Sequence, residues 1–294
     1  MFRFIRVCLL TVPLCLLTVT HAAPAPPALN PRRPPTLDEL DVTVRKSILP
    51  SWIGDFYGSK RFLTKADKET FARPLNVQCG EKIQLNTLDR GSYNLGLYNL
   101  RGDYEGHPAS TAVVKILPGP TDKRAWGEVK ALQAVGQYID SGLLQPRNQL
   151  AIVMKKVEGE IITYTKTWAE SDATKKKELL NQMKVFVKKQ FKDWVHEKGM
   201  AYVHFAYQNM LVTIDSNGSI RSCRLVDLGY YGVFKVESPD SVTDSQIDEF
   251  FEKQWLHMMT VGHLLASDQI LNVSKCRGLN GTVVKLLTTP PLCR

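Results

Sequence analysis

Apolar side chains recur every third or fourth position along two long stretches of the chain, and this spacing predicts two amphipathic helices. The first stretch is 174–198 and is followed by Gly199, a residue type that commonly ends helices. The second is 243–266, and a shorter stretch with the same spacing predicts a helix over 123–138. The apolar positions of the two long helices are Leu180, Met183, Val187, Phe191 and Trp194, and then Ile247, Phe250, Phe251, Trp255, Met258 and Leu265.

Elsewhere the pattern changes to short runs rich in β-branched residues, which are typical of strands. Residues 82–117 alternate apolar and polar positions between turn signals and predict three antiparallel strands. Leu150–Val157 predicts one more strand. Met210–Ile214 and Ile220–Val226 predict a hairpin, because the connection 215–218 ends in Asn-Gly. The sequence therefore predicts an α+β fold with a β-rich part before a helical part.

The N-terminal quarter of the chain is predicted to lie outside the main domain. Residues 1–22 carry two arginines and then an apolar run, a pattern typical of a secretory signal peptide. Residues 23–36 contain six prolines and predict an extended linker. Residues 37–79 form a predicted extension with one or two helices within 37–75. The main domain is expected over 80–294, with a β-rich lobe at about 80–157 and a helical lobe at about 158–294.

Cysteine and glycosylation patterns agree with secretion as the expected destination. Cleavage after residue 22 leaves an even number of cysteines, Cys79, Cys223, Cys276 and Cys293. An even number in a secreted chain suggests two disulfides, with Cys276–Cys293 as the preferred local pair and buried free thiols as the alternative. Asn-x-Ser/Thr triplets begin at Asn217, Asn272 and Asn280. No segment after the signal peptide reaches the roughly 20 apolar residues of a membrane helix, so no membrane span is expected.

The chain is basic, with a formal net charge of +9 that falls to +7 once Arg3 and Arg6 leave with the signal peptide. Much of this charge lies at 175–177, 188–189 and Lys192, within the first long predicted helix. A basic surface favours nucleotides, acidic polymers or anionic cell surfaces. A solvated helix face is the simpler interpretation. No nucleic-acid motif accompanies the charge, so no nucleic-acid partner is expected.

Two motifs in the β-rich part have residue types that suit phosphate groups. Gly91 and Gly96 have the spacing of the outer glycines of G-x-G-x-x-G, with Tyr93 at the middle position. Glycines allow backbone N–H groups to approach phosphates closely. Lys115 ends an apolar strand nineteen residues after Gly96, where its amine can reach nucleotide phosphates. Glu128 lies on the next predicted helix, where a solvent-facing glutamate is the simplest interpretation.

A second group of motifs lies in the helical part. Residues 195–212 align without gaps with a loop that contains H-x-D-x-x-x-x-N. The asparagine of that loop falls on Asn209, whereas His204 replaces its aspartate and Tyr202 replaces its histidine. After the predicted hairpin comes Asp227-Leu228-Gly229, which is similar to D-F-G. Carboxylate and amide oxygens are the ligands that Mg²⁺ prefers beside nucleotide phosphates.

These motifs, in this order, resemble those of the protein kinase-like superfamily, which includes the protein kinases and the aminoglycoside phosphotransferases. The resemblance covers residues 80–266 and implies a two-lobed fold that binds ATP and Mg²⁺, with Asn209 and Asp227 as metal ligands. It also implies that Glu128 pairs with Lys115 and orients its amine. It also places Met154 at the gatekeeper position and the backbone around Lys156 against adenine. An ordinary buried strand is the alternative for this last segment, because apolar runs are common.

Two departures from the family pattern bear on function. The position of the catalytic base holds His204, and only 65 residues follow Gly229, without an A-P-E motif. We expect a secreted kinase-like protein that retains nucleotide and Mg²⁺ binding and has weak or absent phosphotransfer, as in pseudokinases. An active secretory-pathway kinase for proteins or small molecules is the first alternative. A nucleotide-free interaction scaffold or secreted effector is the second, and the protein partner or substrate is not identified by the sequence.

Overall fold

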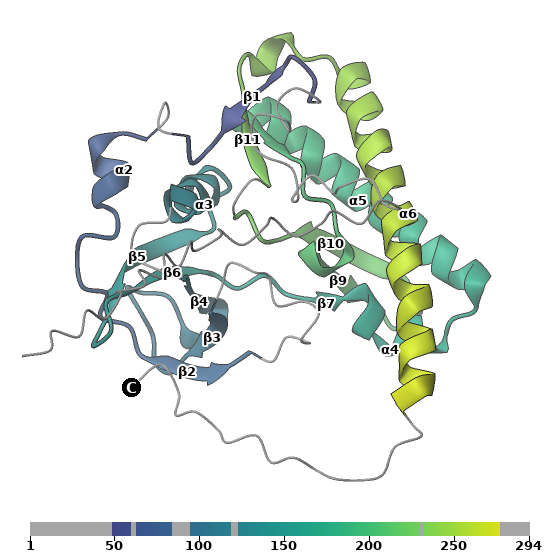
Figure 1. Ribbon diagram of the computed structural model, residues 1–294, viewed down its shortest axis with the longest axis horizontal. Coiled ribbons are helices and arrows are strands. Elements are labelled where there is room, and N and C mark those ends of the chain that lie inside the picture. The colour runs from purple at the N-terminus through teal and green to yellow at the C-terminus, as the bar shows by residue number, and fades with distance from the viewer. Residues whose placement is uncertain (1–48, 60–62, 84–94, 119–122, 230–231, 277–294) are drawn as a thin grey trace, which may run out of the picture. The chain divides into compact units, whose positions relative to one another are not determined.

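The β-rich part of the chain forms one five-stranded antiparallel sheet in the computed structural model (Figure 1). The structure describes residues 49–59, 63–83, 95–118, 123–229 and 232–276, of which 123–124 and 261–276 are described by their backbone alone. The strand order is β2-β3-β4-β6-β5. The strands are β2 (Cys79–Lys82), β3 (Gly96–Leu100), β4 (Ala112–Ile116), β5 (Tyr138–Leu144) and β6 (Gln149–Lys155). Every residue of the central strand β4 is buried, so a polar side chain on it must find a partner inside the protein.

One helix, α3 (Lys123–Ala134), connects β4 to β5 and contacts the β5–β6 side of the sheet. Its buried apolar residues join a core cluster that continues into the long helices, whereas β2, β3 and β4 each contribute buried residues to a second cluster. In Figure 1, α3 lies between the sheet and the N-terminal elements. Helix α3, which carries Glu128, therefore lies against the sheet on one side and the N-terminal elements on the other.

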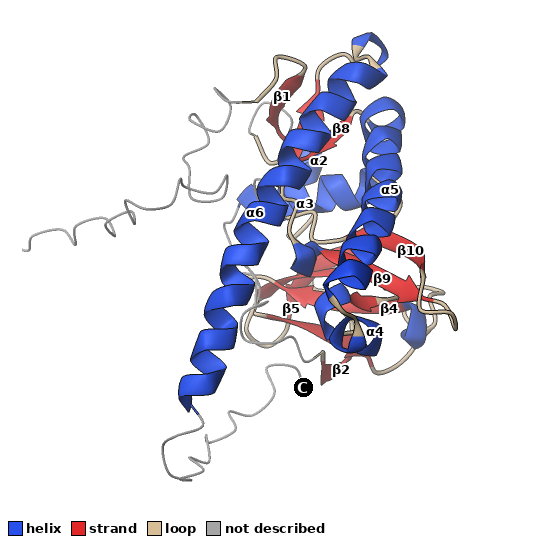
Figure 2. Cartoon of the chain, turned by 90° about the vertical axis from the view of Figure 1, so that its right-hand side faces the viewer, coloured by secondary structure: helices blue, strands red, loops and turns tan. Residues whose placement is uncertain are grey.

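Two long helices dominate the second part of the chain. Helix α5 (Ala173–Lys198) begins at Asp172, whose carboxylate accepts the N–H of Lys175, and ends at Gly199 in the left-handed conformation with φ of 58°. Helix α6 (Asp244–Cys276) runs antiparallel beside α5 (Figure 2). Their apolar faces meet around an aromatic cluster in which Phe191 contacts Phe205, Phe250 and Phe251. This cluster anchors the loop that contains His204, because Phe205 is the next residue.

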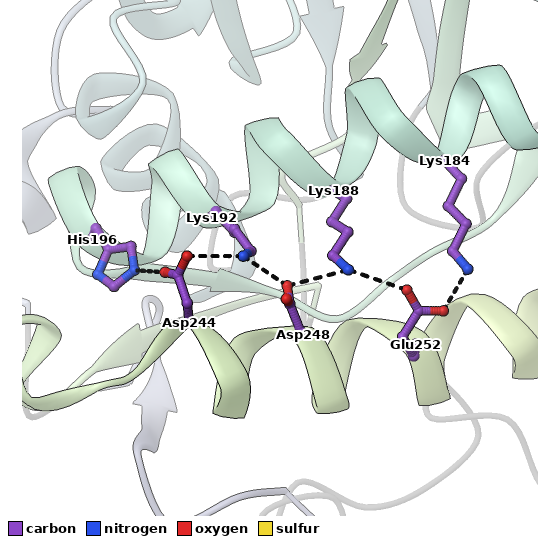
Figure 3. A network of polar contacts seen from close by, with 7 residues as sticks. All are labelled: Lys184, Lys188, Lys192, His196, Asp244, Asp248 and Glu252. Atoms are coloured by element: carbon purple, nitrogen blue, oxygen red, sulfur yellow. Dashed lines mark hydrogen bonds and ion pairs between the residues drawn. The ribbon is translucent and has the colours of Figure 1, made fainter.

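Polar contacts also fix how α5 and α6 lie against each other. Lysines spaced four residues apart on α5 face carboxylates with the same spacing on α6 (Figure 3). The chain of contacts joins Lys184 to Glu252, Lys188 to Glu252 and Asp248, Lys192 to Asp248 and Asp244, and His196 to Asp244. Part of the positive charge at 188–192 is therefore paired with carboxylates of α6. This side of α5 is not simply a solvated helix face. Partly exposed pairs stabilise little singly, so the ladder mainly fixes the register of the two helices.

Two small antiparallel sheets connect the remaining segments. One has the order β10-β9-β7 and the other β1-β11-β8. Their strands are β7 (Glu160–Ile161), β9 (Met210–Ile214) and β10 (Ile220–Leu225), and then β1 (Ile53–Phe56), β11 (Val233–Val236) and β8 (Met200–Tyr202). Among the described residues the short helices are α2 (Lys65–Glu69) and α4 (Lys166–Glu170). Four 3-10 helices of one turn each cover Ala109–Thr111, Ile162–Tyr164, Tyr207–Asn209 and Pro239–Ser241.

The elements with strong periodicity are confirmed. The hairpin of β9 and β10, both long helices and the Gly199 stop lie where the sequence predicts them, and α6 continues beyond 266. The predicted helix 123–138 is too long, because the chain turns at Gly136 with φ of 68° and enters β5. Residues 37–75 were predicted as helical, but within their described part the chain forms strand β1 as well as the short α2.

Cysteine and membrane predictions are settled only in part. Cys223 is a buried free thiol, which contradicts full pairing of the four mature cysteines, and burial raises its pKa to about 12. The preferred pair Cys276–Cys293 lies outside the described side chains, as do the predicted signal peptide and linker. Within the part of the chain that the structure describes, no helix is sufficiently long and apolar to span a bilayer.

Candidate functional site

The candidate site centres on one lysine that bonds two carboxylates from distant parts of the sequence. The Nζ of Lys115 on β4 donates to Glu128 Oε1 on α3 at 2.6 Å. It also donates to Asp227 Oδ1, in the loop after β10, at 2.7 Å. The predicted pairing of Lys115 with Glu128 is confirmed, and Asp227 joins the same cluster. These three residues are called the charged triad below.

Burial divides the charged triad into an inner pair and an outer carboxylate. The side chains of Lys115 and Glu128 are 6% and 5% exposed, whereas that of Asp227 is 35% exposed. Burial opposes a charged amine, but Asp227 and Glu128 offset it and raise the pKa of Lys115. Burial raises the pKa of Glu128, and the charge of Lys115 lowers that of Asp227. Asp227 is therefore the carboxylate that stays ionised and faces solvent.

The backbone around Asp227 is held in an uncommon conformation. Asp227 has φ of 58°, in the left-handed region that non-glycine residues seldom adopt. Gly229 follows in close contact with the triad, since a Cβ there would lie 3.1 Å from Glu128 Oε2 and 3.3 Å from Asp227 Oδ1. A larger residue at 229 would thus crowd both carboxylates. Strained backbone of this kind persists where the surrounding structure holds it, and such positions concentrate at functional sites.

Asn209 and His204 lie beside the charged triad. Asn209 is buried, and its Nδ2 donates to the backbone carbonyl of His204 at 3.2 Å, with His204 Nδ1 also at 3.2 Å. A charged His204 would also lower the pKa of Asp227, by less than Lys115 does. Among the contacts of the described residues, none occupies Asn209 Oδ1. The amide oxygen is therefore the atom of Asn209 that remains for a ligand.

Tyr202, at the position of the motif histidine, has a contact that sequence reasoning did not anticipate. Its side chain is fully buried, and its hydroxyl donates to the carbonyl of Val226 at 3.1 Å. The N–H of Val226 in turn donates to the carbonyl of Asn209 at 2.9 Å. Val226 directly precedes Asp227, so these two bonds tie the loop of Asn209 to the loop of Asp227. In the sequence, the only sign of this link between the two loops is a tyrosine at the position of the motif histidine, two residues before His204.

The other predicted nucleotide-binding residues are only partly placed. Gly91 lies outside the described residues. Gly96 begins β3 with φ of 149°, a backbone conformation that other residues rarely adopt, so this position favours glycine. Met154 is half-buried on β6 beside β4, opposite Val113. None of these contacts the charged triad in the described structure.

Lys156 lies at the centre of the segment Lys155–Val157, whose backbone is predicted to meet adenine. Its N–H donates to the carbonyl of Thr111 at 2.8 Å, and the N–H of Lys155 donates to Gln137 at 2.8 Å. Both donors are thus occupied within the protein. Of the N–H groups of Lys155–Val157, only that of Val157 has no partner among the described residues and remains to meet a ligand. The exposed side chain of Lys156 instead reaches Asn99 Oδ1 at 3.4 Å.

The donor set of the site fits a hard cation bound with phosphates. Asp227 offers a solvent-facing carboxylate, Asn209 an amide oxygen without a partner among the described contacts, and Lys115 a fixed positive charge. The ionised, solvent-facing carboxylate of Asp227 shares the single amine with Glu128, so it keeps negative charge that a cation would neutralise. No group of three His, Cys, Asp or Glu side chains forms a ready metal cage in the described part of the chain. A cation here would therefore share its coordination with the ligand and water.

No known family matches the chain, and none of the curated proteins searched is significantly similar to it.

Proposed function

We propose that this chain is a secreted kinase-like protein that binds ATP with Mg²⁺ and has weak or absent phosphotransfer. The observation that carries the proposal is the charged triad, in which Lys115 bonds both Glu128 and Asp227. In protein kinases a lysine on the third strand pairs with a glutamate on the next helix, and the D-F-G aspartate holds the metal. Lys115 lies on the third strand of the five-stranded sheet in chain order, and Glu128 on the helix that follows.

The arrangement of elements supports the same proposal. A small antiparallel sheet with one helix comes first, and two long helices with a β-hairpin follow. We interpret these as the β-rich and helical lobes of a kinase-like fold, with the helical lobe shortened. Asn209 lies in the loop before the hairpin and Asp227 in the loop after it, so the hairpin brings both predicted metal ligands to one end. The two predicted metal ligands can therefore act together although they belong to separate motifs.

Within this proposal each residue has a distinct role. Lys115 would bond nucleotide phosphate oxygens, and Glu128 would hold its amine in place. Asp227 and Asn209 would hold Mg²⁺, which when bound neutralises phosphate charge. His204 would lie beside the phosphates. A neutral imidazole there can accept a proton, whereas an imidazolium would add positive charge that favours ATP binding and opposes base catalysis.

The retained pair of Asn209 and Asp227 favours a second candidate, an active kinase of the secretory pathway. A pure scaffold requires neither residue, but ATP chemistry requires both. Phosphoryl transfer depends mainly on positioning and charge neutralisation, so loss of the catalytic aspartate would slow the reaction without abolishing it. Binding and turnover are therefore tested separately below.

Removal of the Asp227 carboxylate should abolish Mg²⁺-dependent nucleotide binding. The mature protein should gain about 2.7 kcal/mol of stability at ATP·Mg²⁺ concentrations 100-fold above Kd, which corresponds to about 5–10 °C in Tm. Asp227→Ala should show no such shift while remaining folded, because Lys115 keeps Glu128 as its partner. Asp240→Ala, an exposed aspartate far from the motif, serves as control and should behave like wild type. Metal-dependent stabilisation of Asp227→Ala equal to that of wild type would refute the site assignment.

Restoration of an aspartate at position 204 should reveal whether the rest of the catalytic site is complete. His204→Asp should raise the rate of phosphate transfer or ATP hydrolysis by at least about tenfold if the protein is a weakened kinase. His204→Asn is the matched control, since it has similar size and cannot act as a base. Equal rates for the two variants would argue against the active-kinase candidate and favour a binding protein.

A further inference from the structure

The residues before the main domain are integrated into the structure around the candidate site. We call the described stretches 49–59 and 63–75 the N-terminal strap. Its strand β1 pairs with β11, which begins six residues after Asp227. Trp52 packs edge-on against Phe250 of α6, and Tyr57 donates its N–H to Val233 at 3.2 Å. The strap is thus fixed to the segment that follows Asp227 and to the helical core.

The strap also approaches α3 so closely that no side chain fits between them. A Cβ placed on Gly127 would lie 2.7 Å from the backbone nitrogen of Gly58 and 2.8 Å from its Cα. Gly127 directly precedes Glu128. Glycine is unfavourable within a helix, so its presence here is explained by the close backbone contact with the strap. The backbone at 57–58 is therefore in direct contact with the α3 turn that carries Glu128.

A second contact holds α3 two residues after Glu128. The Nζ of Lys130 donates to Asp67 Oδ2 at 2.8 Å, and both side chains are largely buried, at 23% and 17% exposed. Asp67 is itself fixed, because Thr64 and Asp67 form a reciprocal capping box at the start of α2. The carboxylate that receives Lys130 is consequently held in place by the strap's own helix.

The far end of the strap is anchored to the five-stranded sheet. Arg73 forms an ion pair with the buried Asp140 on β5, and Tyr104 donates to the same carboxylate at 2.5 Å. The backbones of Arg73 and Leu75 exchange hydrogen bonds with Leu143 at 2.9 Å. The strap is therefore fixed at both ends, at β11 and at β5, with α3 contacting it between these points.

We propose that the N-terminal strap is a built-in positioning element that holds α3 so that Glu128 stays bonded to Lys115. Gly58, Gly127, Asp67 and Lys130 are its positioning residues. In kinases the position of the glutamate-bearing helix controls whether the lysine–glutamate pair forms. The strap would make that pair permanent in this chain without a separate partner. The consequence for nucleotide affinity rests on the proposed function, but the positioning of α3 does not.

Hydrogen exchange of α3 in the full mature chain tests the inference without any ligand. Lys130→Met should speed exchange of the α3 amides by about tenfold, because the bond to the Asp67 carboxylate is lost, and should increase labelling of Lys115 by an amine-reactive reagent. Lys130→Arg keeps the charge and should restore both readouts. Lys65→Met removes an exposed pair from the same short helix α2, with Lys65 91% exposed, and should change neither.

Gly127→Ala provides an independent test. Whether the α3 amides exchange faster or slower than in wild type distinguishes positioning by the strap from the intrinsic stability of the helix. Alanine favours a helix more than glycine does, so α3 amides should exchange more slowly if the contact with Gly58 is unimportant. The proposal expects faster exchange and weaker ATP·Mg²⁺ binding. Folded Lys130→Met and Gly127→Ala variants with unchanged or slower α3 exchange would overturn it. Wild-type protein that fails to bind ATP·Mg²⁺ would instead refute the proposed function, while the exchange result would still decide the role of the strap.

Discussion

Lys115→Met should be the most destabilising single substitution in the candidate site, with a loss of about 3–5 kcal/mol in the free energy of unfolding. The substitution removes the only cation that the charged triad contains and leaves two carboxylates close together. Glu128 is almost fully buried and carries most of the penalty. Asp227 is about one third exposed, so water screens part of its charge and its share is smaller. Equilibrium urea unfolding at pH 7 measures the loss.

The destabilisation should depend on pH in a direction that identifies its cause. Burial raises the pKa of Glu128 in the folded state, so the folded protein binds this proton more tightly than the unfolded chain does. Stability from that group is present below the unfolded pKa and is lost as pH rises through the folded pKa. Without Lys115 the folded pKa of Glu128 rises further. The deficit of Lys115→Met relative to wild type should therefore be larger at pH 8 than at pH 5.

Two further variants separate the buried charge from a loss of packing. Glu128→Gln combined with Lys115→Met should recover at least half of the deficit, because the uncompensated inner charge is gone. Lys155→Met changes an exposed lysine at the end of a strand and should shift stability by no more than about 0.5 kcal/mol. A loss below about 1 kcal/mol for Lys115→Met, or a deficit independent of pH, would mean that the triad is not a coupled electrostatic unit.

The residues of the triad could be predicted because each belongs to a short local pattern. Lys115 ends an apolar strand, Glu128 lies on the next periodic segment, and Asp227 follows a hairpin marked by Asn-Gly. Such local patterns can be recognised in the sequence without knowledge of long-range contacts. Their order along the chain then restricts the folds in which they can occur. The sequence could not show that the amine bonds both carboxylates at once, since that depends on how α3 and the loop after β10 are placed beside the sheet.

The N-terminal strap illustrates what the sequence pattern could not reveal. Residues 53–56 form a strand only because β11 offers an edge far away in the sequence, so strand propensity alone gives a weak signal. Gly127 inside a helical pattern was a detectable warning of close backbone approach, but its contact with Gly58 depends on tertiary structure. Similarly, the lysines of α5 predict a solvated helix face from the sequence alone. The structure pairs several of them with carboxylates of α6, which lie far away in the sequence.

Phe191→Ala should have the largest effect outside the candidate site, a loss of about 3–5 kcal/mol in unfolding free energy. The side chain has no exposed surface and contacts three rings, so alanine would leave a cavity that neighbours from two helices and a loop cannot easily fill. Phe191→Leu keeps most of the apolar volume and should lose only about 1–2 kcal/mol. Val185→Ala changes an exposed residue of the same helix and should stay within about 0.5 kcal/mol.

The same substitution should also loosen the loop of the candidate site, because Phe191 supports that loop through one ring. Phe205, the residue after His204, packs edge-on against Phe191 at 5.6 Å and against Tyr202 at 5.5 Å. A cavity at 191 removes one side of this support, so amides of 203–209 should exchange faster in Phe191→Ala than global destabilisation alone explains. Val185→Ala should leave that loop unchanged. If Phe191→Ala speeds exchange uniformly over the whole chain, the aromatic cluster stabilises the core without specifically holding His204 and Asn209 in place.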